Sequence, residues 1–185
     1  MNIKPLKDDL LIEKAIIMAA ECFKDKRSNK KPALLHSIRV GFKLRDYGQP
    51  GEVVAAGILH DLIEDTNCTI EEIRDKFGSK VAKLVSLCTC EDSSGDTDER
   101  WHKFIDKVVK GGKTAMIIRV VDANDNLPYI FLIKDEKYAE RILWKHEIQI
   151  SKIKRKISNL QIFKDYSKNY RRTAKEVRAK YKKGG

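Results

Sequence analysis

An uninterrupted apolar run that ends in charged side chains is the feature that most constrains this chain. Residues 53–59 are all apolar or glycine, which predicts a helix buried on every side. The next seven residues read His-Asp-Leu-Ile-Glu-Asp-Thr and end at Thr66. Carboxylates at a helix C-terminus oppose the helix dipole, and burying them requires a cation or a cationic partner. The sequence therefore favours a metal site here over a helix end that frays into solvent.

Further ligands must come from other segments, because one helix cannot surround an ion. His36 lies in an apolar, helix-compatible segment that precedes the His60-Asp61 pair. Asp122 directly follows a largely apolar run, where a carboxylate needs a partner if it is buried. His102 is interpreted as a surface residue. The predicted ligands are two imidazoles and two carboxylates, from His36, His60, Asp61 and Asp122.

This ligand set suits a borderline-hard divalent ion with open coordination positions. We expect Mn²⁺, with Fe²⁺, Zn²⁺ and Mg²⁺ as alternatives. Such an ion acts as a Lewis acid on a phosphoryl group and activates water. Glu64, one turn beyond His60 if the segment is helical, is predicted to position or deprotonate that water, with Asp65 as its partner in proton transfer. Two nearby carboxylates repel each other, so one of them is expected to have a raised pKa.

The residues around Thr66 also predict local helix capping. Thr69 followed by Glu72 forms the pattern of a capping box at the start of the next helix. We therefore interpret Thr66 and Thr69 as capping residues and keep the chemical role for Glu64.

The pattern His36, His60-Asp61 and Asp122 resembles the signature of the HD-domain metal-dependent phosphohydrolases. The extension through Glu64 to Thr66 is similar to the His-Asp-x-x-Glu-Asp-Thr motif of a narrower group. These are the alarmone 3′-pyrophosphohydrolases, comprising RelA/SpoT-type hydrolase domains and their small stand-alone relatives. The resemblance extends over roughly residues 8–145.

The resemblance implies two substrate-binding residues as well. Arg27 matches the arginine of the family's Arg-Lys-x-Gly-x-Pro segment, and its guanidinium is expected to hold a phosphate. Asn126 matches the asparagine of the family's Asp-x-x-x-Asn motif and is expected to hold the base or ribose. The chain departs from the family at positions expected to line the nucleotide pocket, namely Ser28, Asn29, Lys30, Asn124, Asp125, Pro128 and Tyr129.

Helical periodicity extends over almost the whole chain, so the expected fold is all-α, an HD-domain helical bundle. Residues 48–51 read as a turn, and residues 91–98 as a polar loop. The predicted helices cover residues 9–23, 33–47, 51–65, 69–76, 78–90, 98–110, 113–123 and 135 onward.

The charge is confined to the end of the chain. Of the 38 Lys and Arg and the 27 Asp and Glu, residues 151–185 hold 13 and 2, which leaves 25 and 25 for residues 1–150. We therefore predict an HD phosphohydrolase domain at 1–150 and a basic C-terminal helical extension at 151–185. The extension's apolar stripe is expected to dock as far as Leu160. The remainder is predicted to attract polyanions without taking part in catalysis.

The expected function is hydrolysis of guanosine-3′,5′-bis(diphosphate), ppGpp, to GDP and pyrophosphate. One alternative is an HD hydrolase of another nucleotide or phosphorylated metabolite. Another is a nucleotide-binding or nucleic-acid-binding protein on the same fold. The basic and aromatic residues of the extension raise nucleic-acid binding, which we rank below a solvated helix face or a cationic lid. A homodimer stays an alternative for the assembly.

Other sequence features point to a cytoplasmic enzyme with a small-molecule nucleotide substrate. No segment is apolar enough to span a membrane, and the first residues lack the apolar core of a signal peptide. The four cysteines, Cys22, Cys68, Cys88 and Cys90, include no second close pair, so they are expected to be reduced thiols.

Overall fold

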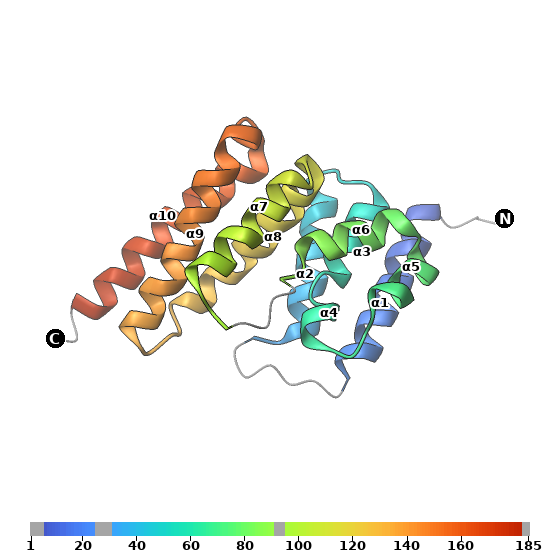
Figure 1. The fold of residues 1–185 in the computed structure, drawn as a ribbon, viewed down its shortest axis with the longest axis horizontal. Helices are drawn as coiled ribbons and strands as arrows, with labels where there is room; N and C mark the ends of the chain where they lie inside the picture. Colours follow the sequence, from blue (N-terminus) through green and yellow to red (C-terminus); the bar gives the residue numbers. More distant parts are fainter. Residues whose placement is uncertain (1–5, 25–30, 91–94, 183–185) are drawn as a thin grey trace. The chain divides into compact units, whose positions relative to one another are not determined.

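The computed structural model describes residues 6–24, 31–90 and 95–182, and within these ranges it contains helices and no strand (Figure 1). The all-α prediction is confirmed. The chain divides into two compact units, Met1–Glu91 and Asp92–Gly185. Among the described helices, none is both long enough and apolar enough to cross a bilayer.

The first unit is built around α3. Its helices are α1 (Lys7–Phe23), α2 (Ala33–Asp46), α3 (Gly51–Leu59), α4 (Leu62–Asp65), α5 (Ile70–Phe77) and α6 (Ser79–Cys88). The apolar run predicted to be buried on every side is indeed the core, because every residue from Val53 to Leu59 is buried. Helices α1, α2 and α6 each pack against α3 and cover different sides of it.

Two glycines allow α2 and α3 to approach closely. A Cβ atom added to Gly57 would lie 2.3 Å from Leu44 Cδ1 and 3.7 Å from the Cα of Gly41. A Cβ atom added to Gly41 would lie 2.3 Å from Ile58 Cγ1. Any larger residue would force the two helices apart, because their neighbours Leu44 and Ile58 are fully buried. In the sequence, the two glycines of this crossing lie between His36, near the start of α2, and His60, just after α3.

The second unit is a bundle of four helices, in which α10 packs against both α8 and α9 and α7 packs against the same two helices (Figure 1). The helices are α7 (Asp98–Lys110), α8 (Lys113–Ile130), α9 (Glu136–Ile157) and α10 (Gln161–Lys182). Their facing sides are apolar, with Ile105, Ile118, Leu143 and Ile153 among the fully buried side chains.

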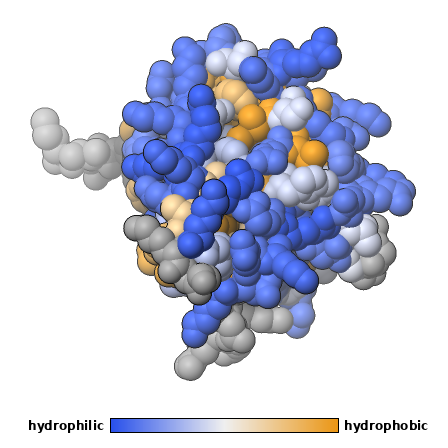
Figure 2. All heavy atoms as spheres, turned by 90° about the vertical axis from the view of Figure 1, so that its left-hand side faces the viewer, coloured by the Kyte–Doolittle hydropathy of each residue, from blue (hydrophilic) through white to orange (hydrophobic). Residues whose placement is uncertain are grey.

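The end of the chain is more deeply integrated than its charge predicted. The apolar stripe does not stop near Leu160 but continues along α10, where it buries Phe163, Tyr166, Tyr170 and Val177. The prediction of a docking stripe ending at Leu160 is therefore wrong. The buried positions repeat every three or four residues, the spacing of one helix face. The opposite face carries exposed cations, in keeping with the hydrophilic surface that Figure 2 shows over most of the face it draws.

Burial of these aromatic rings also bears on the nucleic-acid alternative. Bases stack on aromatic side chains only where the rings are accessible. Phe163 and Tyr166 lie in the core of the second unit, and Tyr181 donates a hydrogen bond to the carbonyl of Ile133 at 2.7 Å. What α10 exposes is a row of lysines and arginines, which matches a solvated basic helix face.

Three predicted helical segments differ from the structure, and one of them is the segment from residue 135 onward, which divides into α9 and α10. The segment 51–65 is not one helix, because α3 ends at Leu59 and α4 begins at Leu62, with His60 and Asp61 in the turn between them. Helix α8 continues to Ile130, well beyond the predicted end at residue 123, and includes Pro128. A proline close to a helix C-terminus removes only one backbone hydrogen bond, which this end tolerates.

The α2–α3 crossing gives a test of the fold. Gly41→Ala should lower the free energy of unfolding by about 1–3 kcal/mol, the usual cost of overpacking a core. In an Ile58→Ala background, which removes the clashing side chain, the same substitution should cost much less. Urea unfolding of the four proteins in this double-mutant cycle measures the difference. Additive effects of the two substitutions would contradict the close approach.

Candidate metal centre

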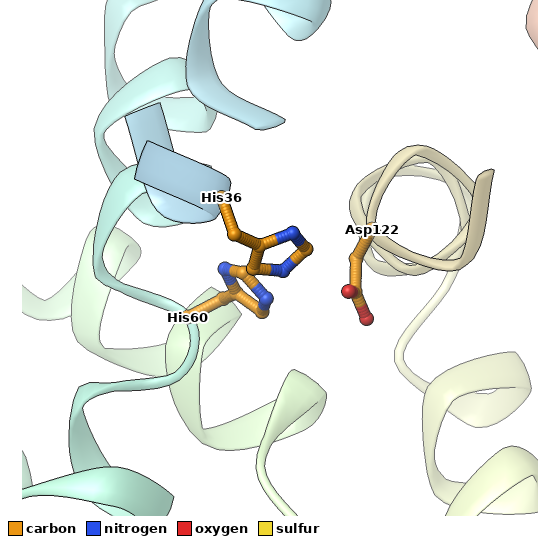
Figure 3. A group of neighbouring side chains, drawn as sticks. All are labelled: His36, His60 and Asp122. Carbon is orange, nitrogen blue, oxygen red and sulfur yellow. The ribbon is translucent and has the colours of Figure 1, made fainter. Parts of the chain in front are cut away.

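His36 and His60 come together because α2 and α3 cross closely. Their ring centroids lie 5.2 Å apart in an edge-to-face arrangement, and potential ligand nitrogens of the two rings lie within 4.8 Å of each other (Figure 3). Both side chains are buried, with exposed fractions of 0% and 2%. A buried imidazole needs polar partners, and Gly57 and Asp61 of the same unit supply them.

A backbone hydrogen bond fixes the orientation of His60. Its Nδ1 lies 2.7 Å from the carbonyl oxygen of Gly57, an acceptor, so Nδ1 carries the proton. In the neutral ring Nε2 then presents a lone pair, and it lies 2.9 Å from Oδ1 of Asp61. A carbonyl that holds the far nitrogen of a ligand histidine is the usual support of a metal site. Gly57 therefore serves both the helix crossing and the orientation of this ring.

The carboxylate of Asp61 lies close to nitrogen atoms of three side chains of the first unit, Lys31, His36 and His60. Its Oδ2 lies 3.5 Å from His36 Nε2 and 3.4 Å from Lys31 Nζ. A lone pair on His60 Nε2 and a carboxylate oxygen at 2.9 Å repel each other unless a proton or a cation lies with them. Two imidazole nitrogens and one carboxylate are ligands suited to a divalent transition-metal ion. The donor set of His36, His60 and Asp61 thus fits the ion predicted from the sequence.

Glu64 and Asp65 lie on the short helix α4, directly after this donor set. Glu64 Oε1 accepts a hydrogen bond of 2.7 Å from the backbone N–H of Cys90, at the end of α6. Partial burial, and after it the negative charge of Asp61, raise the pKa of Asp65. The pKa of Asp65 is thus raised, as expected for one carboxylate of the pair, but the causes are burial and Asp61 and not repulsion from Glu64. The contact between Glu64 and Cys90 was not predicted from the sequence.

Of the two threonines expected to cap the helix that follows, Thr69 caps α5 as predicted, whereas Thr66 is the C-terminal cap of α4. Thr66 donates to the carbonyl of Leu62 at 2.7 Å and accepts from the N–H of Cys68 at 3.0 Å. Thr69 and Glu72 form the expected capping box at the start of α5.

In the second unit, Asp122 is held at both of its oxygens. It lies on α8 with 3% exposure, and its side chain projects from that helix in Figure 3. Asn126, one turn later, donates to Oδ1 at 2.7 Å. Arg119, one turn earlier, donates from Nη1 to Oδ2. Asn126, expected to bind substrate, thus has a positioning contact with Asp122.

Arg119 was not singled out from the sequence, although a signal for it existed. An arginine one turn before an aspartate in an otherwise apolar helix indicates an ion pair on one helix face. Asn124 is explained by packing as well, since its side-chain oxygen accepts a hydrogen bond of 3.0 Å from Asn169 of α10. Arg27, Ser28, Asn29 and Lys30 lie outside the described residues.

The fold and the donor set define a class, an all-helical protein in which two buried histidines and an adjacent aspartate form a donor set that fits a divalent ion. The sequence model of one family, described as the HD domain, matches residues 15–106. The chain is therefore a member of the HD-domain family, as its His…His-Asp signature predicted.

Two curated relatives share the family's core. The guanosine-3′,5′-bis(diphosphate) 3′-pyrophosphohydrolase of Aquifex aeolicus is 31% identical over 115 residues, which are 60% of this chain and 16% of that protein. The Drosophila melanogaster protein named guanosine-3′,5′-bis(diphosphate) 3′-pyrophosphohydrolase MESH1 is 36% identical over 75 residues, 40% of this chain and 41% of the relative. The chain thus spans less than half the length of either relative.

Two solved structures share the fold. One, described as a metazoan ortholog of SpoT that hydrolyzes ppGpp, has a TM-score of 0.78 at 21% identity and covers 92% of this chain and 97% of its own. The other, from Listeria monocytogenes EGD-e, has a TM-score of 0.63 at 27% identity, with coverages of 76% and 99%.

Burial of His146 in the second unit predicts a pH dependence of stability. Burial first, and then the charge of Arg119, lower the pKa of His146 from 6.5 to about 3. Between these values the unfolded chain binds a proton that the folded protein does not. Stability should therefore fall with decreasing pH below about 6.5, by up to about 1.4 kcal/mol per pH unit.

His146→Gln keeps an acceptor for the Tyr166 hydroxyl, which lies 2.7 Å from His146 Nδ1, but cannot titrate. Urea unfolding at a series of pH values should show a shallower slope for this variant than for the wild type. Equal slopes would mean that His146 is protonated in the folded protein.

Proposed function

We propose that this protein is a metal-dependent phosphohydrolase that removes the 3′-pyrophosphate of guanosine-3′,5′-bis(diphosphate). The observation that carries the proposal is the donor set of the buried His36 and His60 and the partly exposed Asp61, followed directly by Glu64 and Asp65. The names of the Aquifex and Drosophila relatives support the choice of substrate.

We further propose that Asp122 completes the ligand set of His36, His60 and Asp61. Arg119 and Asn126 donate to the two oxygens of the buried Asp122 carboxylate and fix its plane. Mn²⁺ is our choice of ion for this mixture of imidazole and carboxylate ligands, with Fe²⁺, Zn²⁺ and Mg²⁺ as alternatives. When bound, the ion supplies Lewis-acid activation of the phosphoryl group and of water.

Acid–base work is assigned to the carboxylates of α4. Glu64 is proposed to take a proton from the attacking water, and Asp65, whose pKa is raised, to hold or pass on that proton. Arg27 is proposed to bind a phosphate through its planar guanidinium. The side chain of Asn126, beyond its bond to Asp122, is proposed to contact the base or ribose.

Product analysis tests the proposed reaction. The Mn²⁺-loaded protein should convert ppGpp to GDP and pyrophosphate when assayed against a nucleotide panel that also includes pppGpp and NADPH. Ion-exchange chromatography of the products identifies the bond that is cleaved. Release of single phosphates would indicate a phosphomonoesterase instead, and turnover of another member of the panel alone would show that the substrate assignment is wrong.

Glu64→Gln is the matched control for this assay. A glutamine retains an oxygen that accepts from the Cys90 N–H, so the contact at the end of α6 persists. It cannot take up a proton, and its kcat should fall by about 10²–10⁴-fold, the usual contribution of a general acid–base group. A variant with nearly wild-type kcat would assign Glu64 to the structure of α4 and α6 alone.

A further inference from the structure

A chain of partly or fully buried hydrogen bonds connects Asp122 to α10. Arg119 bonds Asp122 through Nη1 and donates from Nε to Gln149 Oε1 at 2.9 Å. Gln149 Nε2 in turn donates to the hydroxyl of Tyr166 at 3.3 Å, and this hydroxyl lies 2.7 Å from His146 Nδ1. The chain connects α8, α9 and α10 inside the second unit, and Gln149 and Tyr166 are fully buried.

The direction of the bonds from Arg119 to Tyr166 is determined. A guanidinium has donors only, so the amide oxygen of Gln149 faces Arg119 and the amide nitrogen faces Tyr166. The direction of the contact between the Tyr166 hydroxyl and His146 Nδ1 depends on the tautomer of the imidazole. The Gln149 amide therefore has one orientation that satisfies both of its neighbours, which makes this hydrogen-bond chain a rigid support.

Aromatic rings hold the guanidinium of Arg119 as well. Its central carbon lies 5.2 Å from the ring centroid of Trp101 and 5.4 Å from that of Phe104, both on α7. Stacking on aromatic faces confines a planar guanidinium. The guanidinium is thus held by the two rings and by the bond from Nε to Gln149, and in this position its Nη1 donates to the Asp122 carboxylate.

We propose that Arg119 is a positioning residue that fixes the plane of the Asp122 carboxylate for metal binding, and that Tyr166 of α10 holds Arg119 in place through Gln149. The inference rests on the proposed role of Asp122 as a metal ligand. It makes α10 a structural support of the metal centre, whereas its charge alone marked it as an appendage. Groups that orient a metal ligand usually affect metal affinity about 10–100-fold.

Arg119→Lys tests the proposal, with Arg141→Lys as its matched control. Both substitutions keep the charge and remove a planar fork. Arg141 also stacks on a tryptophan, with 4.7 Å to the Trp144 centroid, and also pairs with aspartates of the second unit, Asp96 and Asp98. Mn²⁺ titration of the metal-free proteins by calorimetry should show affinity about tenfold weaker for Arg119→Lys and unchanged for Arg141→Lys. Thermal unfolding of each variant measures the loss of packing that they share.

A second pair of variants tests the connection to α10. Tyr166→Phe removes only the hydroxyl that bonds Gln149, while Tyr170→Phe removes a hydroxyl that bonds Glu147 at 2.7 Å. Mn²⁺ affinity should fall in the first variant, by about threefold because the change lies three contacts from Asp122, and stay constant in the second. The electron paramagnetic resonance spectrum of bound Mn²⁺, which reports ligand geometry, should change only for Tyr166→Phe and Arg119→Lys.

The outcomes separate this inference from the proposed function. If the wild type binds no Mn²⁺, the metal site itself is wrong and the inference fails with it. If the wild type binds Mn²⁺ and Arg119→Lys binds it within twofold, or loses affinity equally with Arg141→Lys, only the positioning role is overturned. If Arg119→Lys does not fold, the comparison of the two tyrosine variants decides, and equal affinities and spectra overturn the proposal.

Discussion

The close crossing of α2 and α3 at Gly41 and Gly57 is the constraint on which the metal centre depends. Each glycine leaves room for a fully buried side chain of the opposite helix, Leu44 or Ile58. The crossing brings the imidazole of His36 against that of His60. The carbonyl of Gly57 then fixes the His60 ring, so one helix contact sets both the distance and the orientation of two nitrogen donors.

Burial makes this arrangement chemically useful. The core around α3 excludes water from the imidazoles. The turn after α3 places the carboxylate of Asp61 next to the Nε2 atoms of both rings. In such surroundings charges interact more strongly than in water, so a divalent ion gains more from these ligands. Partial burial and the nearby charge of Asp61 raise the pKa of Asp65, so this carboxyl holds a proton more readily than an ordinary aspartate does.

The helical class and the proximity of His36 to His60 and Asp61 could be predicted from the sequence, for identifiable reasons. The heptapeptide from His60 to Thr66 contains the imidazole and carboxylate side chains of His60 and Asp61 next to each other. Burial of α3 follows from its uninterrupted apolar run. The break between Leu59 and Leu62 was not predictable from periodicity, because His60 and Asp61 keep backbone angles in the helical region. The buried stripe of α10 was obscured because lysines and arginines surround Phe163 and Tyr166 on the opposite helix face.

Contacts between distant segments were beyond the sequence altogether. The bonds of Arg119 to Gln149 and of Glu64 to Cys90 join residues 30 and 26 positions apart. Nothing in local pattern reports which side chains meet across a fold. Asp122 on α8 and Glu64 on α4 are therefore held by residues outside the His36, His60-Asp61 and Asp122 pattern. Such contacts give these side chains a defined orientation.

Metal retention is the most direct test of the central claim. Purified wild-type protein, loaded with Mn²⁺ and passed through a desalting column, should retain one ion per chain by elemental analysis. His60→Ala should retain none, while His102→Ala, which removes a histidine that packs on Trp144 and is not one of the donors, should match the wild type. Full retention by a folded His60→Ala variant would contradict the account.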